Sequence, residues 1–205
     1  MMGKNNYNRQ SIRLKKFDYS LSGYYFITIC TEDSERLFGK IINNEMVLND
    51  FGEIVNFEWF ELKNRFDIQL HEFIVMPDHI HGIIEILVDN GMGGDNKGVI
   101  NNAPTSISRD SGNYFSKISP KSNSLSIIIR SYKSCVTRNI RQNTRRGVIH
   151  NTLITNQNNN LTKTDPHQSQ LTIWQRNYFE RVIRNEKELN NIRQYIIDNP
   201  KNWDV

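Results

Sequence analysis

The sequence predicts an α+β fold, an antiparallel sheet with helices packed mainly on one face. Runs rich in aromatic and β-branched residues predict strands, whereas runs whose apolar residues recur at helical spacing predict helices. Their order is a strand, a hairpin, a helix, a pair of strands and two further helices, which is typical of this fold class. The length of 205 residues fits one domain that spans the whole chain.

The first half of the chain begins with a strand and a hairpin. Residues 23–31, GYYFITICT, predict a buried strand because aromatic and β-branched residues dominate it. Asn43 and Asn44 join two short apolar runs and predict a hairpin, since asparagine tolerates positive φ. Asn49 or Asp50 can then cap a helix that continues for about four turns.

A second pair of strands, residues 68–76 and 79–87, flanks the turn-forming Pro77 and Asp78. Residues 124–141 predict a helix whose basic side chains lie away from its apolar side. Segments rich in Gly, Asn and Ser are predicted to be two long, mobile polar insertions within the domain, residues 89–123 and 142–170.

The C-terminal part is predicted to be ordered again. Residues 172–184 predict a strand edge that leads into a short helix. Asn185 and Glu188 then resemble a capping box at the start of a last helix, and Pro200 ends that helix. The buried face of the last helix is expected to carry Leu189, Ile192 and Ile196.

Composition narrows the class of protein. Lysine and arginine number 26 against 22 acidic residues, a formal net charge of +4 that permits a polyanionic partner without requiring one. Cys30 and Cys135 form no dense pattern, and we expect two buried free thiols. The sequence offers neither a secretory signal nor a membrane span, so a cytoplasmic protein without membrane partners is expected.

His79 and His81 stand two residues apart in a predicted strand, in a chain with five histidines. Because strand side chains alternate, both imidazoles share one face with Glu85, and the residues between them form an apolar face. Two imidazoles so placed can bind one divalent cation through neutral nitrogens, or can simply be polar residues with satisfied hydrogen bonds. Glu85 can orient an imidazole or be a surface carboxylate.

Tyr195 and Asn199 lie four residues apart on the last predicted helix and therefore share one stripe of it. Packing explains a helical tyrosine, and a C-cap explains an asparagine before proline. If this helix crosses the histidine face, however, a phenol and an amide oxygen would meet at a metal held by the two histidines. Such a group of side chains can attack a phosphodiester through the tyrosine oxygen.

Here the sequence resembles a known family. MPDHIHGII is similar to the HUH motif, His-hydrophobic-His, of single-tyrosine transposases. GYYFITICT, IWQRNYFERVIRN and YIIDNP resemble the other landmarks of the REP-associated tyrosine transposases and of the wider superfamily of insertion-sequence tyrosine transposases. The resemblance extends over nearly the whole chain except the two polar insertions.

The resemblance implies a ferredoxin-like fold and a metal-dependent strand-transfer reaction. His79 and His81 would bind Mg²⁺ or Mn²⁺, and Asn199 matches the position of the third ligand. Tyr195 matches the nucleophile, which would cleave single-stranded DNA, keep a 5′-phosphotyrosine link and release a 3′-OH that can later rejoin strands. The resemblance also implies DNA that can form hairpins and a homodimer, in which the site lies within one subunit or is shared between two.

Basic residues are candidates for contacts with DNA phosphates, which position a protein without reading bases. Arg13, Lys15 and Lys16 form one cluster, and the basic helix adds Arg130 and Lys133. A solvated helix face would explain the helical residues equally well.

Two other tyrosines compete for the role of nucleophile, Tyr132 and Tyr178, but neither has a ligand-type residue four positions later. Functions of other classes also remain open. A non-catalytic module that binds single-stranded nucleic acid would leave Tyr195 and the histidine pair unexplained. A replication initiator with the same chemistry usually has further domains, and a domesticated, inactive transposase would keep the fold without the reaction.

Overall fold

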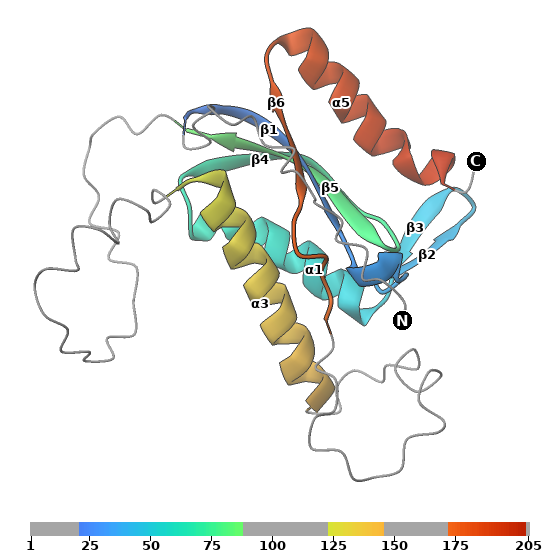
Figure 1. Cartoon of the computed structure of the whole chain (residues 1–205). Helices are drawn as coiled ribbons and strands as arrows, with labels where there is room; N and C mark the ends of the chain where they lie inside the picture. The colour runs from blue at the N-terminus through green and yellow to red at the C-terminus, as the bar shows by residue number, and fades with distance from the viewer. Residues whose placement is uncertain (1–20, 88–122, 146–171, 204–205) are drawn as a thin grey trace, which may run out of the picture.

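The computed structural model describes residues 21–87, 123–145 and 172–203. A four-stranded antiparallel sheet with the order β4-β5-β1-β6 forms its centre (Figure 1). The sheet strands are β1 (Gly23–Cys30), β4 (Ile68–Val75), β5 (His79–Ile86) and β6 (Phe179–Ile183). The α-helices are α1 (Asp50–Phe60), α3 (Leu125–Arg145) and α5 (Glu186–Asp198), and a separate hairpin pairs β2 (Gly39–Ile42) with β3 (Glu45–Leu48).

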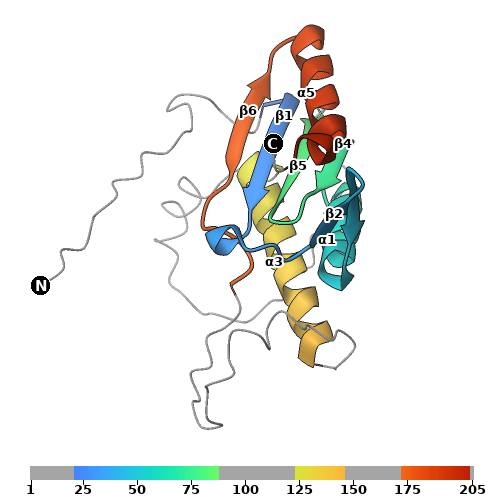
Figure 2. The same ribbon diagram turned by 90° about the vertical axis from the view of Figure 1, so that its right-hand side faces the viewer.

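The topology of the sheet confirms the predicted α+β class. The helix α1 lies between β1 and β4 in the chain, and α3 lies between β5 and β6, so the sheet and these helices form the βαββαβ arrangement of ferredoxin-like domains. Figures 1 and 2 show α1 and α3 on one face of the sheet and α5 on the other. Two of the three α-helices therefore share a face, and the third defines a second face.

The larger apolar core lies between the sheet and helices α1 and α3. Tyr25 and Ile27 of β1 are fully buried in it, together with Trp59 of α1. The Trp59 ring stacks on Phe73 with centroids 4.4 Å apart. A Cβ at Gly82 would lie 2.4 Å from the Trp59 ring, so this close approach of helix and strand requires glycine.

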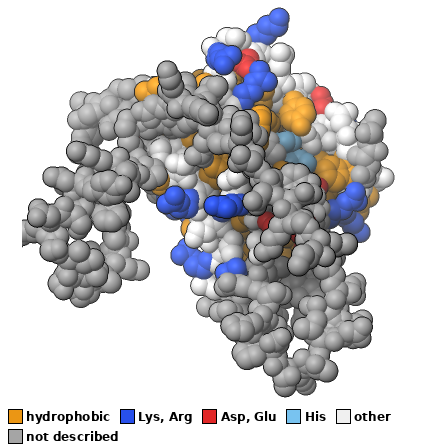
Figure 3. All heavy atoms as spheres, viewed as in Figure 1, with side chains coloured by type: hydrophobic (Ala, Val, Ile, Leu, Met, Phe, Trp, Pro, Cys, Tyr) orange, Lys and Arg blue, Asp and Glu red, His pale blue; other side chains and the backbone are white. Residues whose placement is uncertain are grey.

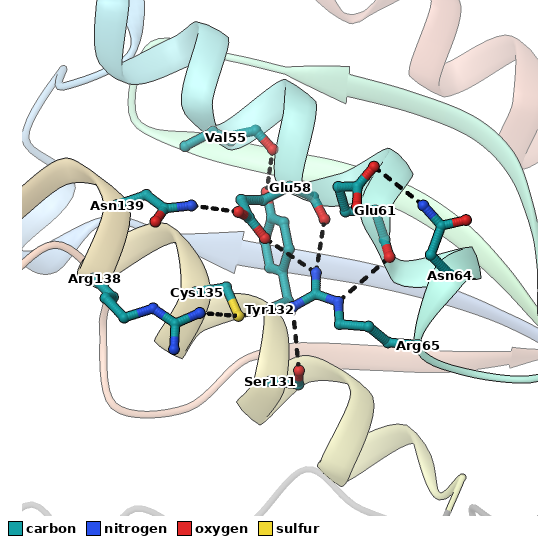
Figure 4. A network of polar contacts seen from close by, with 10 residues as sticks. All are labelled: Val55, Glu58, Glu61, Asn64, Arg65, Ser131, Tyr132, Cys135, Arg138 and Asn139. Carbon is teal, nitrogen blue, oxygen red and sulfur yellow. Dashed lines mark hydrogen bonds and ion pairs between the residues drawn. The ribbon is translucent and has the colours of Figure 1, made fainter. Parts of the chain in front are cut away.

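Polar contacts also join α1 to α3 (Figure 4). The buried carboxylate of Glu58 accepts hydrogen bonds from Arg65 Nη2 at 3.0 Å and from Asn139 Nδ2 at 2.5 Å. The hydroxyl of Tyr132 donates to the carbonyl oxygen of Val55 at 3.0 Å. Because these buried groups are paired, they fix the two helices without the cost of an unsatisfied polar atom.

The predicted hairpin turn and the predicted helix caps are confirmed. Asn43 and Asn44 have φ values of 52° and 63° and form the turn between β2 and β3. The Asn49 side chain caps α1 by accepting from two backbone N–H groups, and Asn185 caps α5 by accepting from the backbone N–H of Glu188.

Two predicted elements are wrong. Residues 172–184 contain no helix: β6 occupies 179–183 and pairs with β1, so sheet pairing overrides the helical propensity of its charged residues. The helix α3 continues to residue 145, and the predicted insertion at 142–170 therefore begins inside it. The remainder of both predicted insertions, 89–122 and 146–170, lies outside the described residues.

Candidate active site

The two histidines of the HUH-like motif begin strand β5. They follow a turn that is closed by a hydrogen bond of 2.8 Å from the backbone N–H of Met76 to the carbonyl oxygen of His79. The alternation of the strand directs both imidazoles to the face that α5 covers. There the Nε2 atoms of His79 and His81 lie 3.1 Å apart, so both rings present the same nitrogen to one point.

A hydrogen bond at Nδ1 orients each ring. The Nδ1 of His81 lies 2.8 Å from the hydroxyl of Thr28, its direct partner in the β1–β5 register. The Nδ1 of His79 lies 2.5 Å from the carboxylate of Asp78. Glu85 was a candidate for this role, but its carboxylate instead lies 2.9 Å from Nε2 of His71. At His79 the Asp78 carboxylate can only accept from Nδ1–H, which favours the tautomer whose Nε2 has a free lone pair, whereas the Thr28 hydroxyl at His81 can donate or accept.

Burial keeps His81 neutral. His81 is only 5% exposed. Desolvation and, to a smaller extent, the neighbouring His79 lower the pKa of His81 to about 3, whereas Asp78 acts to raise it. A neutral imidazole keeps the lone pair that a metal ligand needs.

The tyrosine of the last helix lies directly over this pair. The Tyr195 hydroxyl is 3.3 Å from Nε2 of His81, and the two ring centroids are 5.2 Å apart. Phe26 of β1 stacks against His81 and meets the Tyr195 ring edge-on, with centroids 5.3 and 6.1 Å away. The Tyr195 residue is nevertheless 50% exposed, so the side chain that contacts His81 is also open to solvent. One chain brings these three side chains together by itself.

Asn199 lies one turn beyond Tyr195, at the C-cap of α5, and is buried. Its backbone N–H donates to the carbonyl oxygen of Ile196, as a capping residue does. Asn199 also begins a 3₁₀ turn, Asn199–Asn202, whose first positions include Pro200. The capping interpretation is therefore satisfied, and a ligand role for the Asn199 amide stays a prediction.

Trp203 and Arg36 were not anticipated at this site. The centroid of the Trp203 ring lies 5.8 Å from that of the His79 ring. The guanidinium of Arg36 lies over the same Trp203 ring, 5.4 Å from its centroid. Trp203 follows the YIIDNP segment closely, but the contact of Arg36 depends on the folded path of the chain and has no local signal.

The donor set fits a divalent cation. Within residues 21–87, 123–145 and 172–203, no three His, Cys, Asp or Glu side chains gather as a metal-binding group. Thr28 and Asp78 contact Nδ1 of the two rings, and the converging Nε2 atoms are the two nitrogens that could serve as ligands. Mg²⁺ and Mn²⁺ usually take oxygen ligands as well, which Asn199, water or a phosphate would have to provide.

An ion-pair cluster fastens α5 to the sheet near the tyrosine. Arg193 Nε donates to the Glu72 carboxylate at 2.9 Å, and Nη2 lies 3.3 Å from Nδ1 of His71. His71 and Glu72 occupy the register shift of β4, between Leu70 and Phe73. The cluster therefore connects the tyrosine helix to an irregularity of the edge strand, two residues before Tyr195 in α5.

The predicted DNA-contacting residues fall into three groups. Arg130 is exposed on α3, where lysine and arginine side chains gather over the helix (Figure 3). The Lys133 ammonium donates to the carbonyl oxygens of Gln175 and Asn177 at 2.7 and 2.8 Å, and burial lowers its pKa to about 8. Lys133 thus ties α3 to the segment before β6. Arg13, Lys15 and Lys16 lie outside the described residues.

Lys133 also lines a pocket of about 640 Å³ between α3 and residues 172–176. Three arginines join it there, Arg138, Arg141 and Arg176. The pocket lies on the α3 side, away from the histidine pair, so the basic surface and the candidate active site occupy different faces of the sheet.

The competing tyrosines serve the fold. The Tyr132 hydroxyl is buried in the larger core, and burial raises its pKa well above the ordinary value for tyrosine. Tyr178 packs against the same core. Neither ring is therefore placed as Tyr195 is, half exposed at the histidine pair.

Within the described residues, no helix is long and apolar enough to cross a membrane.

Comparison with known proteins agrees with this arrangement. No protein-family model matches the sequence. An uncharacterized protein of Haemophilus influenzae is 35% identical over 201 residues, which cover 97% of this chain and 91% of that protein. The solved structure of a REP-associated tyrosine transposase bound to a REP hairpin is similar with a TM-score of 0.50 and 15% identity, over 96% of this chain and 76% of that one. The chain therefore belongs to the family of the Haemophilus influenzae protein, and its fold is that of the REP-associated tyrosine transposase.

Proposed function

We propose that this protein is a transposase that cleaves and rejoins single-stranded DNA through a covalent link to Tyr195. The observation that supports this most directly is the distance of 3.3 Å between the Tyr195 hydroxyl and Nε2 of His81, which itself lies 3.1 Å from Nε2 of His79. A half-exposed phenol beside two oriented, converging imidazoles is suited to nucleophilic attack on a phosphodiester.

In the proposed reaction the Tyr195 oxygen forms a bond to the phosphorus atom, and the bond between phosphorus and the 3′ oxygen breaks. The phenol loses its proton and the departing 3′ oxygen gains one, which leaves a 5′-phosphotyrosine and a free 3′-OH. The reverse attack by a 3′-OH rejoins strands without an external energy source. His79 and His81 would hold Mg²⁺ or Mn²⁺, with Asn199 as a third ligand, and such a metal would polarise the phosphate.

We further propose that the substrate includes hairpin-forming DNA, by analogy with the REP hairpin in the similar solved structure. Arg130, with the cluster of Arg13, Lys15 and Lys16, would contact phosphates of this DNA, whereas the Lys133 ammonium is already held by two backbone carbonyl oxygens. The protein would act as a homodimer in the cytoplasm. Because Tyr195 reaches His81 of its own chain, each subunit would carry a whole site.

The test is a cleavage assay with single-stranded oligonucleotides that carry the flanking sequence of the gene. The purified protein is incubated with Mg²⁺ or Mn²⁺, and protein–DNA adducts that resist denaturant are separated by electrophoresis. We expect an adduct that Tyr195→Phe and His79→Ala abolish and that Tyr24→Phe, a matched tyrosine variant on the same sheet face, preserves. An adduct that survives Tyr195→Phe would assign the nucleophile elsewhere.

A second readout examines the metal site without catalysis. Binding of Mn²⁺ to the DNA-free protein, followed by electron paramagnetic resonance, should be lost in His79→Ala and His81→Ala. Single-strand binding with no adduct under any of these conditions would favour the alternative function, a non-catalytic binding module or an inactive transposase. Sedimentation velocity tests the proposed dimer, which a purely monomeric protein at micromolar concentration would contradict.

A further inference from the structure

The candidate active site continues along one row of side chains across the sheet. The strand registers pair His81 of β5 with Thr28 of β1, and Thr28 with Phe179 of β6. Residues paired in this way point to the same face of an antiparallel sheet. Phe179 therefore lies on the face of the histidines, about 10 Å from His81 across two strand spacings.

Phe179 is exposed although it is a large apolar residue. It lies on β6, an edge strand of the sheet, and 39% of the residue is accessible. It belongs to neither of the two apolar clusters, so core packing does not account for it. Its ring meets Phe26 edge-on with centroids 6.4 Å apart, and Phe26 in turn meets Tyr195.

Three aromatic rings thus lead from the nucleophile to the edge of the sheet. Phe26 is buried in the middle, and the outer two, Tyr195 and Phe179, are the exposed ones. Trp203, on the His79 side, is engaged by the His79 ring and by the Arg36 guanidinium. Among the aromatic side chains that the structure describes around the site, Phe179 is therefore the one that presents an exposed ring in line with Tyr195 and Phe26.

We infer that Phe179 is a stacking position for an unpaired base next to the scissile phosphate. An exposed aromatic ring on a sheet surface is a sequence-tolerant platform for a base of single-stranded nucleic acid. The inference rests on the proposed function and deepens it, because it requires the nucleotide beside the cleaved bond to be unpaired. Phe179 would thereby position the strand for Tyr195.

The test measures equilibrium binding of a labelled single-stranded oligonucleotide by fluorescence anisotropy, in the Tyr195→Phe background so that no cleavage occurs. Stacking of one base predicts that Phe179→Ala weakens binding about 5- to 100-fold. Phe179→Trp keeps an aromatic ring and should bind the oligonucleotide about as tightly as the protein with Phe179. Phe57→Ala is the matched control, because Phe57 is 60% exposed on α1, across the sheet from the site, and should have no effect.

Oligonucleotides with a single abasic position, moved one nucleotide at a time past the cleavage point, distinguish stacking from a structural role. When the abasic site replaces the base that stacks on Phe179, the Tyr195→Phe protein with and without Phe179→Ala should bind the oligonucleotide equally. An effect of Phe179→Ala that is absent, or that is the same on every abasic oligonucleotide, overturns the inference. The two proposals fail in distinguishable ways: a wild-type adduct without this coupling removes only the stacking role, whereas coupling without any adduct leaves a base-stacking position on single-stranded DNA and removes the proposed cleavage.

Discussion

The two faces of the sheet are built for different purposes, although the same strands supply both. On the face of α1 and α3, Tyr25 and Ile27 of β1 are buried in the larger core. On the face of α5, the alternate residues Phe26 and Thr28 contact His81. Strand alternation thus lets one segment stabilise the fold and orient the candidate active site at once.

The difference teaches where the protein can change without unfolding. The smaller cluster under α5 consists of five buried apolar residues, Phe26, Ile83, Ile183, Leu189 and Ile196, beside the polar site. The larger cluster has many more members, and the hydrogen bonds of Glu58 with Arg65 and Asn139 lie beside it between α1 and α3. Substitutions on the face of α5 should therefore alter binding and chemistry, and substitutions on the face of α1 and α3 should alter stability.

The largest expected effect comes from removing a core ring on the α1 face. Trp59→Ala should lower the free energy of unfolding by about 3–5 kcal/mol, because it removes a fully buried indole that packs on Phe73 and Tyr132. Urea denaturation followed by circular dichroism measures the change. Phe57→Ala on the same helix is the exposed control and should stay within about 0.5 kcal/mol. Equal losses in both variants would contradict the assignment of this face to stability.

The next prediction concerns the orientation of His81. Thr28→Val keeps the shape of the side chain but removes the hydroxyl that lies 2.8 Å from Nδ1. Loss of such a contact behind a metal-binding imidazole typically weakens metal affinity about 10- to 100-fold, and we expect this for Mn²⁺ measured by calorimetry. Thr28→Ser retains the hydroxyl and should bind Mn²⁺ as the wild type does. Unchanged affinity in Thr28→Val would show that the hydroxyl does not orient the ring.

The sequence predicts the two faces unequally, for physical reasons. Strands, turns and caps depend on neighbouring residues, so the hairpin at Asn43 and the cap at Asn49 could be anticipated. The pairing of Thr28 with His81 depends on the β1–β5 register across 53 residues, which no local pattern encodes. Glu85 was therefore the nearest visible partner, although it contacts His71.

The same limit explains the other differences at the site. Tyr195 was singled out by a family resemblance and by its spacing to Asn199, not by any local sign that α5 would cross the histidine face. Phe179 was assigned to a segment expected to become helical, because an isolated strand with Glu180 and Arg181 shows no strong preference. Only pairing with β1 places it in the row of His81.

A pH dependence should sharpen the comparison, because a buried neutral histidine is confined to one face. The folded-state pKa of His81 is about 3, below the ordinary value near 6.5 of the unfolded chain. Below pH 6.5 the unfolded state therefore binds a proton that the folded state does not, and stability falls as the pH decreases towards 3. Between pH 7 and 5, the loss from this group is about 2 kcal/mol.

Urea denaturation in the presence of a chelator, at pH 7 and pH 5, measures this dependence. His81→Asn is the reference, since other titrating groups affect both proteins and cancel in the difference. The wild type should lose about 2 kcal/mol more than His81→Asn over this interval. Parallel losses in the two proteins would mean that His81 is protonated as readily in the folded state as in the unfolded one.

The smallest effect is expected from the cluster that fastens α5. Arg193→Met removes the ion pair with Glu72 and the contact with His71 but keeps a long side chain on the helix. Both charged groups are about 30% exposed, so global stability should fall by less than about 1 kcal/mol. Amide hydrogen exchange should nevertheless accelerate selectively in α5, because this helix has lost a polar anchor while the helices of the other face have not. Adduct formation should slow by a few fold, and Arg193→Lys should restore part of it, because a cation then remains near Glu72. Uniform acceleration in α1, α3 and α5 would show that the two faces unfold as one unit and that the tyrosine helix has no independent freedom.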